Sequence, residues 1–406
     1  MKYSRSLTKF ITLSFITVTA LQATNGDHLI AVGAKARGMG GASIGISHGA
    51  ESGLSNPALI TSVKGTEIGF GGTLFMPTID TQMSFPSNPS YTSASDKNMI
   101  PEVSIAHRIN DNWYIGIGMW GTAGMGVDYR DATFNPAVGQ MGNFNMVTNL
   151  QLMQFGVPIA YKTGGLSVAV TPILQYGNLD INFMAQQPTN PPTFANNGSG
   201  LSQDFAFGYN LGLAYNFASQ GMKGLTVGLL YKSAIEMVYK GQLSTAMAGF
   251  GVANFSDSLE QPAEIGVGFS YVSGKHTFAF DYKKIQWSST KGYGDFDWSD
   301  QDIYALGYAY TQDNWVVRAG YNYGKSPISE STNALNNTLN LLGFPGNSEQ
   351  HYTLGGSYNI SETFSVDLAY VYSPKSSNTF TNTAVKVPIT TDHTESSVSF
   401  QLVYKF

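Results

Sequence analysis

From Thr66 onward the chain repeats one pattern: an alternating apolar and polar segment, a tight turn, a second such segment and a long polar loop. The last segment shows the alternation best, with Val398, Phe400, Leu402, Tyr404 and Phe406 on one face and Ser399, Gln401, Val403 and Lys405 on the other. Since successive side chains point to opposite faces of a strand, each segment is predicted to be a β-strand with one apolar face. The segments have about the 9–11 residues that a tilted strand needs to cross a membrane.

Short turns and long loops alternate strictly along this part of the chain. Short turns are predicted at 110–112, 163–165, 218–223, 273–275, 312–314 and 360–362, and long loops near 80–99, 125–147, 185–202, 241–260, 288–301, 325–349 and 374–393. This alternation implies about 14 antiparallel strands with all short turns at one end, which is typical of outer-membrane barrels. We therefore predict an all-β fold, with residues 66–406 forming a transmembrane antiparallel β-barrel. A soluble sandwich is disfavoured because it would not tolerate so many outward Tyr and Phe side chains.

A barrel of this size leaves a hole, because eight strands are filled by their own side chains and 16–18 enclose an aqueous channel. Residues 24–65 precede the first strand, lack a period-2 pattern and are rich in Gly, Ala and Ser. Such a segment can fold compactly inside a barrel, where its backbone polar groups find partners that lipid would not offer. We predict that residues 24–65 form a plug, or hatch, in the lumen. A loose periplasmic tail is the alternative.

The first 23 residues have the pattern of an export signal. Lys2, Arg5 and Lys9 precede the mildly apolar stretch 10–21, and Ala23 ends a small-residue cleavage site. The apolar stretch is too short to span a membrane, so an uncleaved anchor is disfavoured. Residues 1–23 are therefore predicted to be a signal peptide.

Composition supports the barrel and excludes several other classes. Only 12% of the residues are charged, against about 25% in soluble domains, while 13% are aromatic and 45 are Gly. The chain has no Cys, which excludes a disulfide scaffold and a cysteine-ligated metal site. A formal charge of −5 gives no basic footprint, so nucleic acid is not an expected partner.

Two motifs in the predicted hatch resemble those of a known family. The run 55–60, Ser-Asn-Pro-Ala-Leu-Ile, resembles the Asn-Pro-Ala hatch motif of the FadL/TodX outer-membrane transporters of long-chain fatty acids and hydrophobic compounds. The run 37–42, Arg-Gly-Met-Gly-Gly-Ala, is similar to that family's entry to the hatch, and further similarity lies at 100–102, 281–288, 315–321 and the C-terminal Phe406. The resemblance implies a monomer in the lipid and lipopolysaccharide of a Gram-negative outer membrane.

The same resemblance implies a mechanism of uptake. Ligand lands among the outer loops and passes to a lumenal site, a shift of the hatch opens a path, and a kink in the third strand gives a lateral exit. The implied gating residues of the hatch are Arg37, Asn56, Pro57 and Ala58. Gly116, Gly118, Gly121, Gly124 and Gly126 of the third strand are candidates for the kink, since glycine weakens a strand. Glycines that ease barrel curvature, and an ordinary Asn-Pro turn, are the alternatives.

Candidate ligand-binding residues fall into an apolar and a basic group. The outer loops carry Phe250, Phe255, Leu341 and Phe344, which form either a landing groove or a lid of loops packed on one another. A fatty-acid carboxylate requires a cation, for which Lys232, Lys283, Lys291 and Arg318 are candidates. Pairing of these bases with Asp281 and Asp367 within the wall is the alternative. In the family that the chain resembles, fatty-acid transporters tend to carry bases near the extracellular end of the fifth strand. Here residues 176–184 offer none, which leaves neutral hydrocarbons open as ligands.

No catalytic or cofactor motif accompanies these features. Asp295, Asp297, Asp300 and Asp302 hint at a cation site but lack the pattern of a calcium loop, so a solvated loop is favoured and no metal or cofactor is expected. The sequence thus predicts passive uptake of hydrophobic compounds. A porin for small solutes is the main alternative, and a barrel phospholipase or an adhesive barrel are less favoured.

Overall fold

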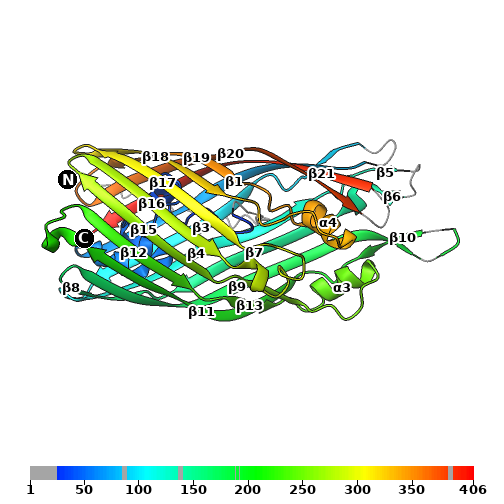
Figure 1. Cartoon of the computed structure of the whole chain (residues 1–406), viewed down its shortest axis with the longest axis horizontal. Helices are drawn as coiled ribbons and strands as arrows, with labels where there is room; N and C mark the ends of the chain where they lie inside the picture. The colour runs from blue at the N-terminus through cyan, green and yellow to red at the C-terminus, as the bar shows by residue number, and fades with distance from the viewer. Residues whose placement is uncertain (1–24, 85–88, 136–139, 188, 192, 383–386) are drawn as a thin grey trace, which may run out of the picture.

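The computed structural model describes residues 25–84, 89–135, 140–187, 189–191, 193–382 and 387–406 (Figure 1). The described strands close into a 14-strand antiparallel β-barrel, which confirms the fold predicted from the hydrophobic pattern. The predicted signal peptide, residues 1–23, lies outside the described residues and stays a prediction. Among the described residues, no helix is long and apolar enough to cross a membrane.

The wall strands follow one another in chain order around the barrel, and the fourth is interrupted. They are β1 (Thr66–Met83), β3 (Asn98–Arg108), β4 (Trp113–Asp128), β7 (Val147–Gly156) with β8 (Ile159–Thr163), β9 (Leu166–Gln187), β11 (Ser202–Asn216), β12 (Leu225–Lys232), β15 (Glu264–Ser273), β16 (His276–Ile285), β17 (Gln301–Thr311), β18 (Trp315–Gly324), β19 (Gln350–Asn359), β20 (Phe364–Asn382) and β21 (Val387–Lys405). The barrel closes where β1 pairs with β21 in continuous register from Glu67 opposite Lys405 to Met83 opposite Ile389. This closure leaves neither terminal wall strand with a free edge.

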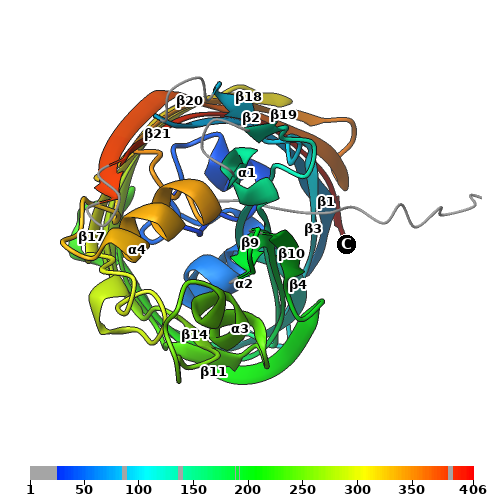
Figure 2. The same ribbon diagram turned by 90° about the vertical axis from the view of Figure 1, so that its right-hand side faces the viewer.

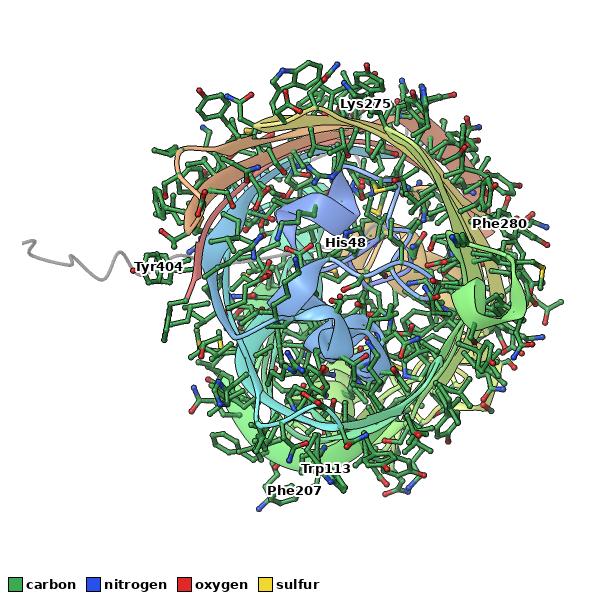
Figure 3. The ribbon with its side chains drawn as sticks, turned by 90° about the vertical axis from the view of Figure 1, so that its left-hand side faces the viewer. His48, Trp113, Phe207, Lys275, Phe280 and Tyr404 are labelled. Atoms are coloured by element: carbon green, nitrogen blue, oxygen red, sulfur yellow. The ribbon has the colours of Figure 1, made fainter. Side chains whose placement is uncertain are left out.

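Apolar side chains face outward, as expected of a wall in contact with lipid. On β21, Val398, Phe400 and Tyr404 are exposed, while the intervening Ser397 and Ser399 are buried. Exposed aromatic residues occur toward both ends of the wall: Trp113, Tyr271, Trp315, Tyr358 and Phe406 near the short turns, and Phe205, Phe207, Tyr231, Tyr304 and Tyr352 toward the long loops. Figure 3 shows Trp113, Phe207, Phe280 and Tyr404 on the outside of the wall and His48 inside it. Aromatic girdles of this kind mark the two interfaces of a membrane barrel.

Several strands run farther than the sequence predicted. The region 374–393 was expected to be a loop, yet β20 and β21 pair from Asn382 opposite Val387 downward, with a register shift between Ser373 and Ser376. The predicted limit of about ten residues counts only the hydrocarbon, whereas a two-stranded ladder satisfies its own backbone and can continue into water. The same explanation holds for β9, which spans 22 residues.

The remaining elements gather at the long-loop end. They are β2 (Tyr91–Thr92), β5 (Phe134–Asn135), β6 (Gln140–Met141), η3 (Gly142–Asn145), β10 (Thr193–Asn197), β13 (Ile235–Val238), α3 (Gln242–Gly249), β14 (Ser258–Gln261), η5 (Trp287–Ser289), α4 (Ala334–Thr338) and η6 (Leu339–Gly343), whereas η4 (Phe217–Gln220) lies in a short turn. In the end-on view of Figure 2, α3 and α4 lie across the mouth of the barrel. The outer loops therefore form a cover over the lumen.

Residues 25–65, here called the N-terminal segment, lie inside the barrel (Figures 2 and 3). The segment folds into short helical turns: α1 (Ala34–Arg37), η1 (Gly49–Glu51), α2 (Ser52–Ser55) and η2 (Pro57–Ser62). Most of its residues are buried, including polar ones such as Arg37, Ser52 and Asn56. A chain with this many small residues can approach the wall closely: a Cβ on wall residue Gly228 would lie 1.9 Å from the carbonyl oxygen of Ile44.

Candidate functional site

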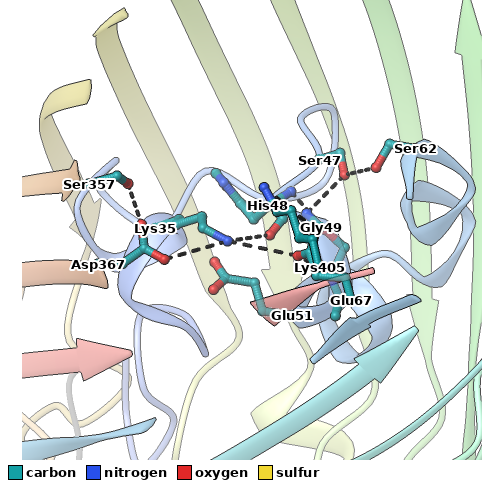
Figure 4. A network of polar contacts seen from close by, with 12 residues as sticks. Lys35, Ser47, His48, Gly49, Glu51, Ser62, Glu67, Ser357, Asp367 and Lys405 are labelled. Carbon is teal, nitrogen blue, oxygen red and sulfur yellow. Dashed lines mark hydrogen bonds and ion pairs between the residues drawn. The ribbon is translucent and has the colours of Figure 1, made fainter. Parts of the chain in front are cut away.

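Ion pairs join the N-terminal segment to the wall near the short turns. Lys35 on α1 places its Nζ atom 3.6 Å from Asp367 on β20 and 4.0 Å from Glu67 on β1, and donates to the His48 carbonyl oxygen at 3.1 Å (Figure 4). Glu51 lies in the same network and accepts from the backbone N–H of Ala36 at 3.2 Å. Because these groups come from the segment and from both sides of the barrel closure, the segment is held by charge as well as by packing.

Arg37, a predicted gating residue, is fully buried in this network. Its Nη2 donates to Ser397 Oγ on β21 at 2.6 Å, and its Nη1 donates to the Ala31 carbonyl oxygen at 3.3 Å. Burial lowers the pKa of the Arg37 guanidinium to about 10, opposed by Glu102 and Glu395, so it remains protonated at neutral pH. Arg37 thus fastens α1 to the wall.

The Asn-Pro-Ala motif forms a second attachment. Asn56 donates through Nδ2 to the carbonyl oxygens of Ile44 at 2.8 Å and of Leu213, on β11, at 3.2 Å, and its Oδ1 accepts from the N–H of Ala58. Pro57 opens η2, where its fixed φ suits a first helical position. A Cβ at wall residue Gly212 would lie 2.2 Å from Asn56 Oδ1, so glycine is required there for the close approach. The motif therefore joins two parts of the segment to the wall.

The third wall strand, β4, separates from β3 partway along its length. The ladder between them runs from Arg108 opposite Tyr114 only to Glu102 opposite Trp120. Beyond that pair β4 continues along β7, with a register shift between Gly121 and Ala123. We call this region the β3–β4 separation.

At this separation the N-terminal segment pairs with the edge of β4 through backbone hydrogen bonds. The Leu29 N–H donates to the Thr122 carbonyl oxygen at 3.2 Å, and the Gly124 N–H donates to the Asp27 carbonyl oxygen at 3.0 Å. Residues 27–29 therefore act as a short strand that stands in for β3. Gly124 takes part through its backbone N–H, as part of a strand edge that the N-terminal segment covers.

Glycines at the separation allow large side chains to lie against β4. A Cβ at Gly118 would lie 1.9 Å from the Trp120 ring, and one at Gly121 would lie 2.3 Å from the Ile100 side chain. At Gly116 the obstruction would be the Ile105 carbonyl oxygen, at 2.5 Å. The structure thus gives the predicted glycines a packing role beside an irregular strand.

A second irregularity lies on the other side of β4. The fourth wall strand breaks at Val157 and Pro158, between β7 and β8, although the Gly116 N–H still donates to the Pro158 carbonyl oxygen at 2.8 Å. Proline cannot donate to a ladder and marks an edge or a bulge. This break was not predicted, although Pro158 within an apolar run could have indicated it.

A lumenal cavity of about 70 Å³ lies between the N-terminal segment and the wall. Its apolar lining includes Ile30, Leu54, Leu230, Ile235 and Ile303, and its charged lining comprises Lys232, Lys283, Glu264, Asp281 and His28. Glu264 faces three of these groups: Lys232 Nζ at 3.3 Å, Lys283 Nζ at 3.9 Å and His28 Nδ1 at 3.2 Å. Asp281 accepts from the backbone N–H groups of Ser43 and Ile44, at 2.6 and 2.7 Å.

Above the cavity, the start of the described chain is enclosed by aromatic side chains. Asp27 accepts hydrogen bonds from the Tyr293 hydroxyl and from Gln261 Nε2. Burial raises the pKa of the Asp27 carboxyl, opposed chiefly by the neighbouring His28. Tyr293 packs with Trp287 and Trp298 at ring distances of 4.8 Å. This enclosure holds residues 25–28 beneath the outer loops.

The apolar outer-loop candidates divide into two groups. Leu341 and Phe344 are buried in the cluster beneath the loops, as the lid alternative predicted. Phe250 and Phe255 are half-buried: Phe250 stacks on Phe183 at 4.5 Å and Phe255 on Phe296 at 5.5 Å. Only this second group offers surface to an arriving ligand.

Two of the four basic candidates lie away from the cavity lining. Lys291 pairs with Glu236 at 2.7 Å in an outer loop. Arg318 donates to Ser357 Oγ at 2.6 Å, and Ser357 in turn donates to Asp367, which places Arg318 in the network around Lys35. Lys232 and Lys283 do line the cavity, together with Glu264. Lys232 and Lys283 therefore pair within the wall, but with Glu264 rather than with the expected Asp281 and Asp367.

The carboxylates of Asp295, Asp297 and Asp300 each contact different partners and do not form one cluster. Asp297 accepts from Ser331 and Asn336, Asp295 accepts from the Gly292 N–H, and Asp300 pairs with Lys284. Over the described ranges, no group of three or more His, Asp or Glu side chains is arranged to hold a metal ion.

A closed barrel with an apolar exterior and a lumen filled by its own N-terminal segment defines an outer-membrane transport protein rather than an open pore. The chain belongs to the outer membrane protein transport protein family (OMPP1/FadL/TodX), whose sequence profile matches residues 16–406. This confirms the resemblance inferred from the hatch motifs, the outer-membrane location, and membership of a family that transports hydrophobic compounds and fatty acids.

Individual relatives are distant but cover most of the chain. Outer membrane protein P1 of Haemophilus influenzae is 23% identical over 384 residues, covering 78% of this chain and 79% of the relative. A long-chain fatty acid transport protein of Salmonella typhi is 23% identical over 367 residues, covering 78% and 80%.

Solved structures show the shared fold. The toluene transporter TodX of Pseudomonas putida superposes with a TM-score of 0.68 at 18% identity, covering 93% of this chain and 99% of that one. A FadL homologue of Pseudomonas aeruginosa gives a TM-score of 0.65 at 15% identity, covering 96% and 100%.

Proposed function

We propose that the chain takes up hydrophobic compounds passively through a barrel whose N-terminal segment is a movable hatch. Ligand lands on the half-exposed aromatic residues of the outer loops, among them Phe250 and Phe255, and enters the lumenal cavity. It leaves between β3 and β4 once residues 27–29 withdraw. The relatives named for toluene and for long-chain fatty acid transport support this class of ligand.

The observation that carries this proposal is the contact of residues 27–29 with the free edge of β4. A strand edge in a membrane wall must be covered, because unpaired backbone groups are costly in lipid. Here the covering strand belongs to the N-terminal segment and contributes two backbone hydrogen bonds, one at Thr122 and one at Gly124. Two hydrogen bonds of about 1 kcal/mol each can be broken reversibly. A general porin would need no such cover, since its wall is continuous.

The barrel faces lipid along its whole girth, so we propose that it works as a monomer in contact with membrane lipid and lipopolysaccharide. The outward apolar side chains of β18 and β21 fit this arrangement.

A disulfide between the segment and β4 tests the exit. His28 and Ala123 face each other in an isolated antiparallel bridge, and the chain has no native Cys, so His28→Cys with Ala123→Cys gives a clean pair. Oxidation should abolish uptake of a hydrocarbon into cells, and reduction should restore it. The control pair is Thr311→Cys with Val316→Cys, which joins β17 to β18 without touching the segment. Full uptake by the oxidised test pair would refute the exit through the β3–β4 separation.

A further inference from the structure

The two lysines of the lumenal cavity are neutralised by neighbouring carboxylates, chiefly that of Glu264. Glu264 is 4% exposed and lies within ion-pair distance of both cavity lysines, Lys232 and Lys283, as well as of His28. Asp281, which is 3% exposed, adds a second acid to the lining. The two lysines are therefore matched by two acids, and the cavity offers no net positive charge to an anion.

An anionic ligand would have to displace Glu264 from its lysines. Breaking a buried pair is strongly destabilising, because it leaves an uncompensated charge in a low-dielectric environment. A carboxylate drawn to Lys283 would also approach Glu264, whose Oε2 atom is only 3.9 Å from that ammonium. Like charges at this spacing repel. The cavity therefore selects against the ionised form of a fatty acid.

The cavity also contains acceptors that lack donors. Glu264 Oε2 and Asn322 Oδ1 are buried and have no hydrogen-bond partner among the described residues. The orientation of Asn322 is fixed because its Nδ2 donates to the Gly40 carbonyl oxygen at 3.0 Å. Buried acceptors are stabilised by a donor, which a carboxylate and an alkane both lack and a hydroxyl group supplies. The nearby lysine ammonium groups can in turn donate to the hydroxyl oxygen.

The rest of the lining suits the apolar part of a ligand next to its head group, since a cavity of about 70 Å³ is smaller than the one of about 150 Å³ that holds a benzene ring. Ile30 and Leu54 of the N-terminal segment face Leu230, Ile235 and Ile303 from the wall and the outer loops. Burying apolar ligand surface against these side chains supplies the affinity, about 25 cal/mol per Å², while the polar groups decide which head group is accepted. An apolar pocket with a few placed polar groups is the usual form of a specific small-molecule site.

We propose that the lumenal cavity selects uncharged hydroxyl-bearing hydrocarbons, such as long-chain alcohols or phenols, and that Glu264 is the residue that sets this specificity. The inference rests on the proposed function, since it assumes that ligand passes through this cavity. Glu264 neutralises the lysines, so it excludes carboxylates, and it accepts the ligand's hydroxyl hydrogen through Oε2.

Binding of three matched ligands tests the proposal. Dodecanol, dodecane and dodecanoate are titrated at pH 9 into the purified full-length barrel in a fluorinated surfactant, with calorimetric detection. Dodecanol should bind at least about tenfold more tightly than the other two, the factor that a charge-assisted hydrogen bond supplies. Dodecanoate binding as tightly as dodecanol would overturn the exclusion of anions. Dodecane binding as tightly would overturn the role of the hydroxyl group. Binding of none of the three would instead refute the proposed function.

Substitution of Glu264 tests its role directly. Glu264→Gln frees Lys232 and Lys283, so dodecanoate should gain about tenfold in affinity and dodecanol should lose its advantage. Glu236→Gln is the matched control, because Glu236 also pairs with a lysine, Lys291, but lies outside the cavity lining. It should leave the preference unchanged.

A second variant keeps the test valid if Glu264→Gln does not fold, as judged by the heat-modifiable mobility of the barrel. Lys283→Met leaves the cavity with a net negative charge, so it should weaken dodecanoate further and retain dodecanol. An unchanged ratio of the two affinities in both variants would refute the assignment to Glu264.

Discussion

At the scale of single residues, Asn56 shows how one side chain can attach the N-terminal segment to the wall. Its amide bonds to two carbonyl oxygens, one within the N-terminal segment and one on β11, while its oxygen caps η2. Asp at this position would keep the capping acceptor but lose both donors, so only Asn satisfies all three partners.

Asn56→Ala should therefore loosen the segment without unfolding the barrel. Leaving buried carbonyl groups unpaired costs about 1–3 kcal/mol, and the segment should become more sensitive to protease and open more often in single-channel recordings. Asn216→Ala is the control, because Asn216 caps η4 through the same contact to an N–H two residues ahead but is exposed in a short turn. Equal effects of the two substitutions would contradict the role given to Asn56.

Glu51 makes the seating of the segment dependent on pH. Burial raises the pKa of the Glu51 carboxyl from 4.5 to about 8, opposed by Lys35 and reinforced by Glu102 and Asp367. When the N-terminal segment is bound in the lumen, here called seated, Glu51 keeps its proton up to about pH 8, whereas in an unseated segment it would release the proton near pH 4.5. The contribution of Glu51 to seating is fully present below pH 4.5 and is lost as the pH rises toward 8.

In planar bilayers, channel openings should accordingly become more frequent as the pH is raised from 5 to 9. Glu51→Gln, which remains uncharged, should flatten this dependence. A profile in Glu51→Gln as steep as that of the native chain would assign the effect to another group.

Residue pairing was the level least predictable from sequence. Strand alternation placed Lys232, Lys283 and Arg318 on the lumenal face. It could not show that Glu264 would meet two of them, because Glu264 lies on β15 and the two lysines lie on β12 and β16. Arg318 illustrates the limit: it faces inward, yet it belongs to the network around Lys35 rather than to the cavity. Period and parity give the direction of a side chain, whereas pairing depends on the register between strands.

At the scale of elements, the outer loops combine a packed interior with a small receptive surface. Leu341 and Leu342 are fully buried, whereas Phe250, next to α3, stacks on Phe183 from β9 and keeps one side open. Apolar side chains in a loop can either pack against other loops or remain exposed to ligand. The sequence alone could not show which of them form the lid and which form the landing site.

Phe250→Ala should slow capture of ligand at low concentration, because an aromatic contact is worth about 0.5–1.5 kcal/mol beyond its buried area. Uptake rates below saturation should fall severalfold, with the rate at saturation retained. The control is Phe207→Ala, since Phe207 is 81% exposed but lies on the outer face of β11. A loss of uptake that is equal for both phenylalanines would argue against a landing site at Phe250.

The wall strands were the elements best predicted. Val398 to Phe406 alternates so regularly that its outward face followed from the sequence. The break at Pro158 and the extension of β20 to Asn382 did not follow: the first depends on one proline in an otherwise regular strand, and the second on a ladder that continues after the hydrophobic signal has ended.

At the scale of the whole molecule, the barrel and its N-terminal segment are separable in their backbone bonding. The wall is closed by its own ladders, including the long pairing of β1 with β21. The segment adds side-chain contacts and the short pairing at β4.

Deletion of residues 24–56 should therefore leave a folded barrel with a wider lumen and a higher conductance. Heat-modifiable mobility monitors folding, and planar-bilayer recording measures conductance against the full chain. Unchanged conductance would mean that these residues do not obstruct the lumen.

The seating of the N-terminal segment also fixes an order of assembly. Its contacts reach from β1 to β21, and the bond from Arg37 to Ser397 joins residues 360 positions apart. The lumen that receives the segment exists only once the last strand has met the first. The residues translated earliest among those described are thus the last to find their partners, and the segment must wait in the periplasm or travel into the membrane within the closing wall. Any folding factor that binds this chain before the barrel closes therefore binds it while the N-terminal segment is still outside the lumen.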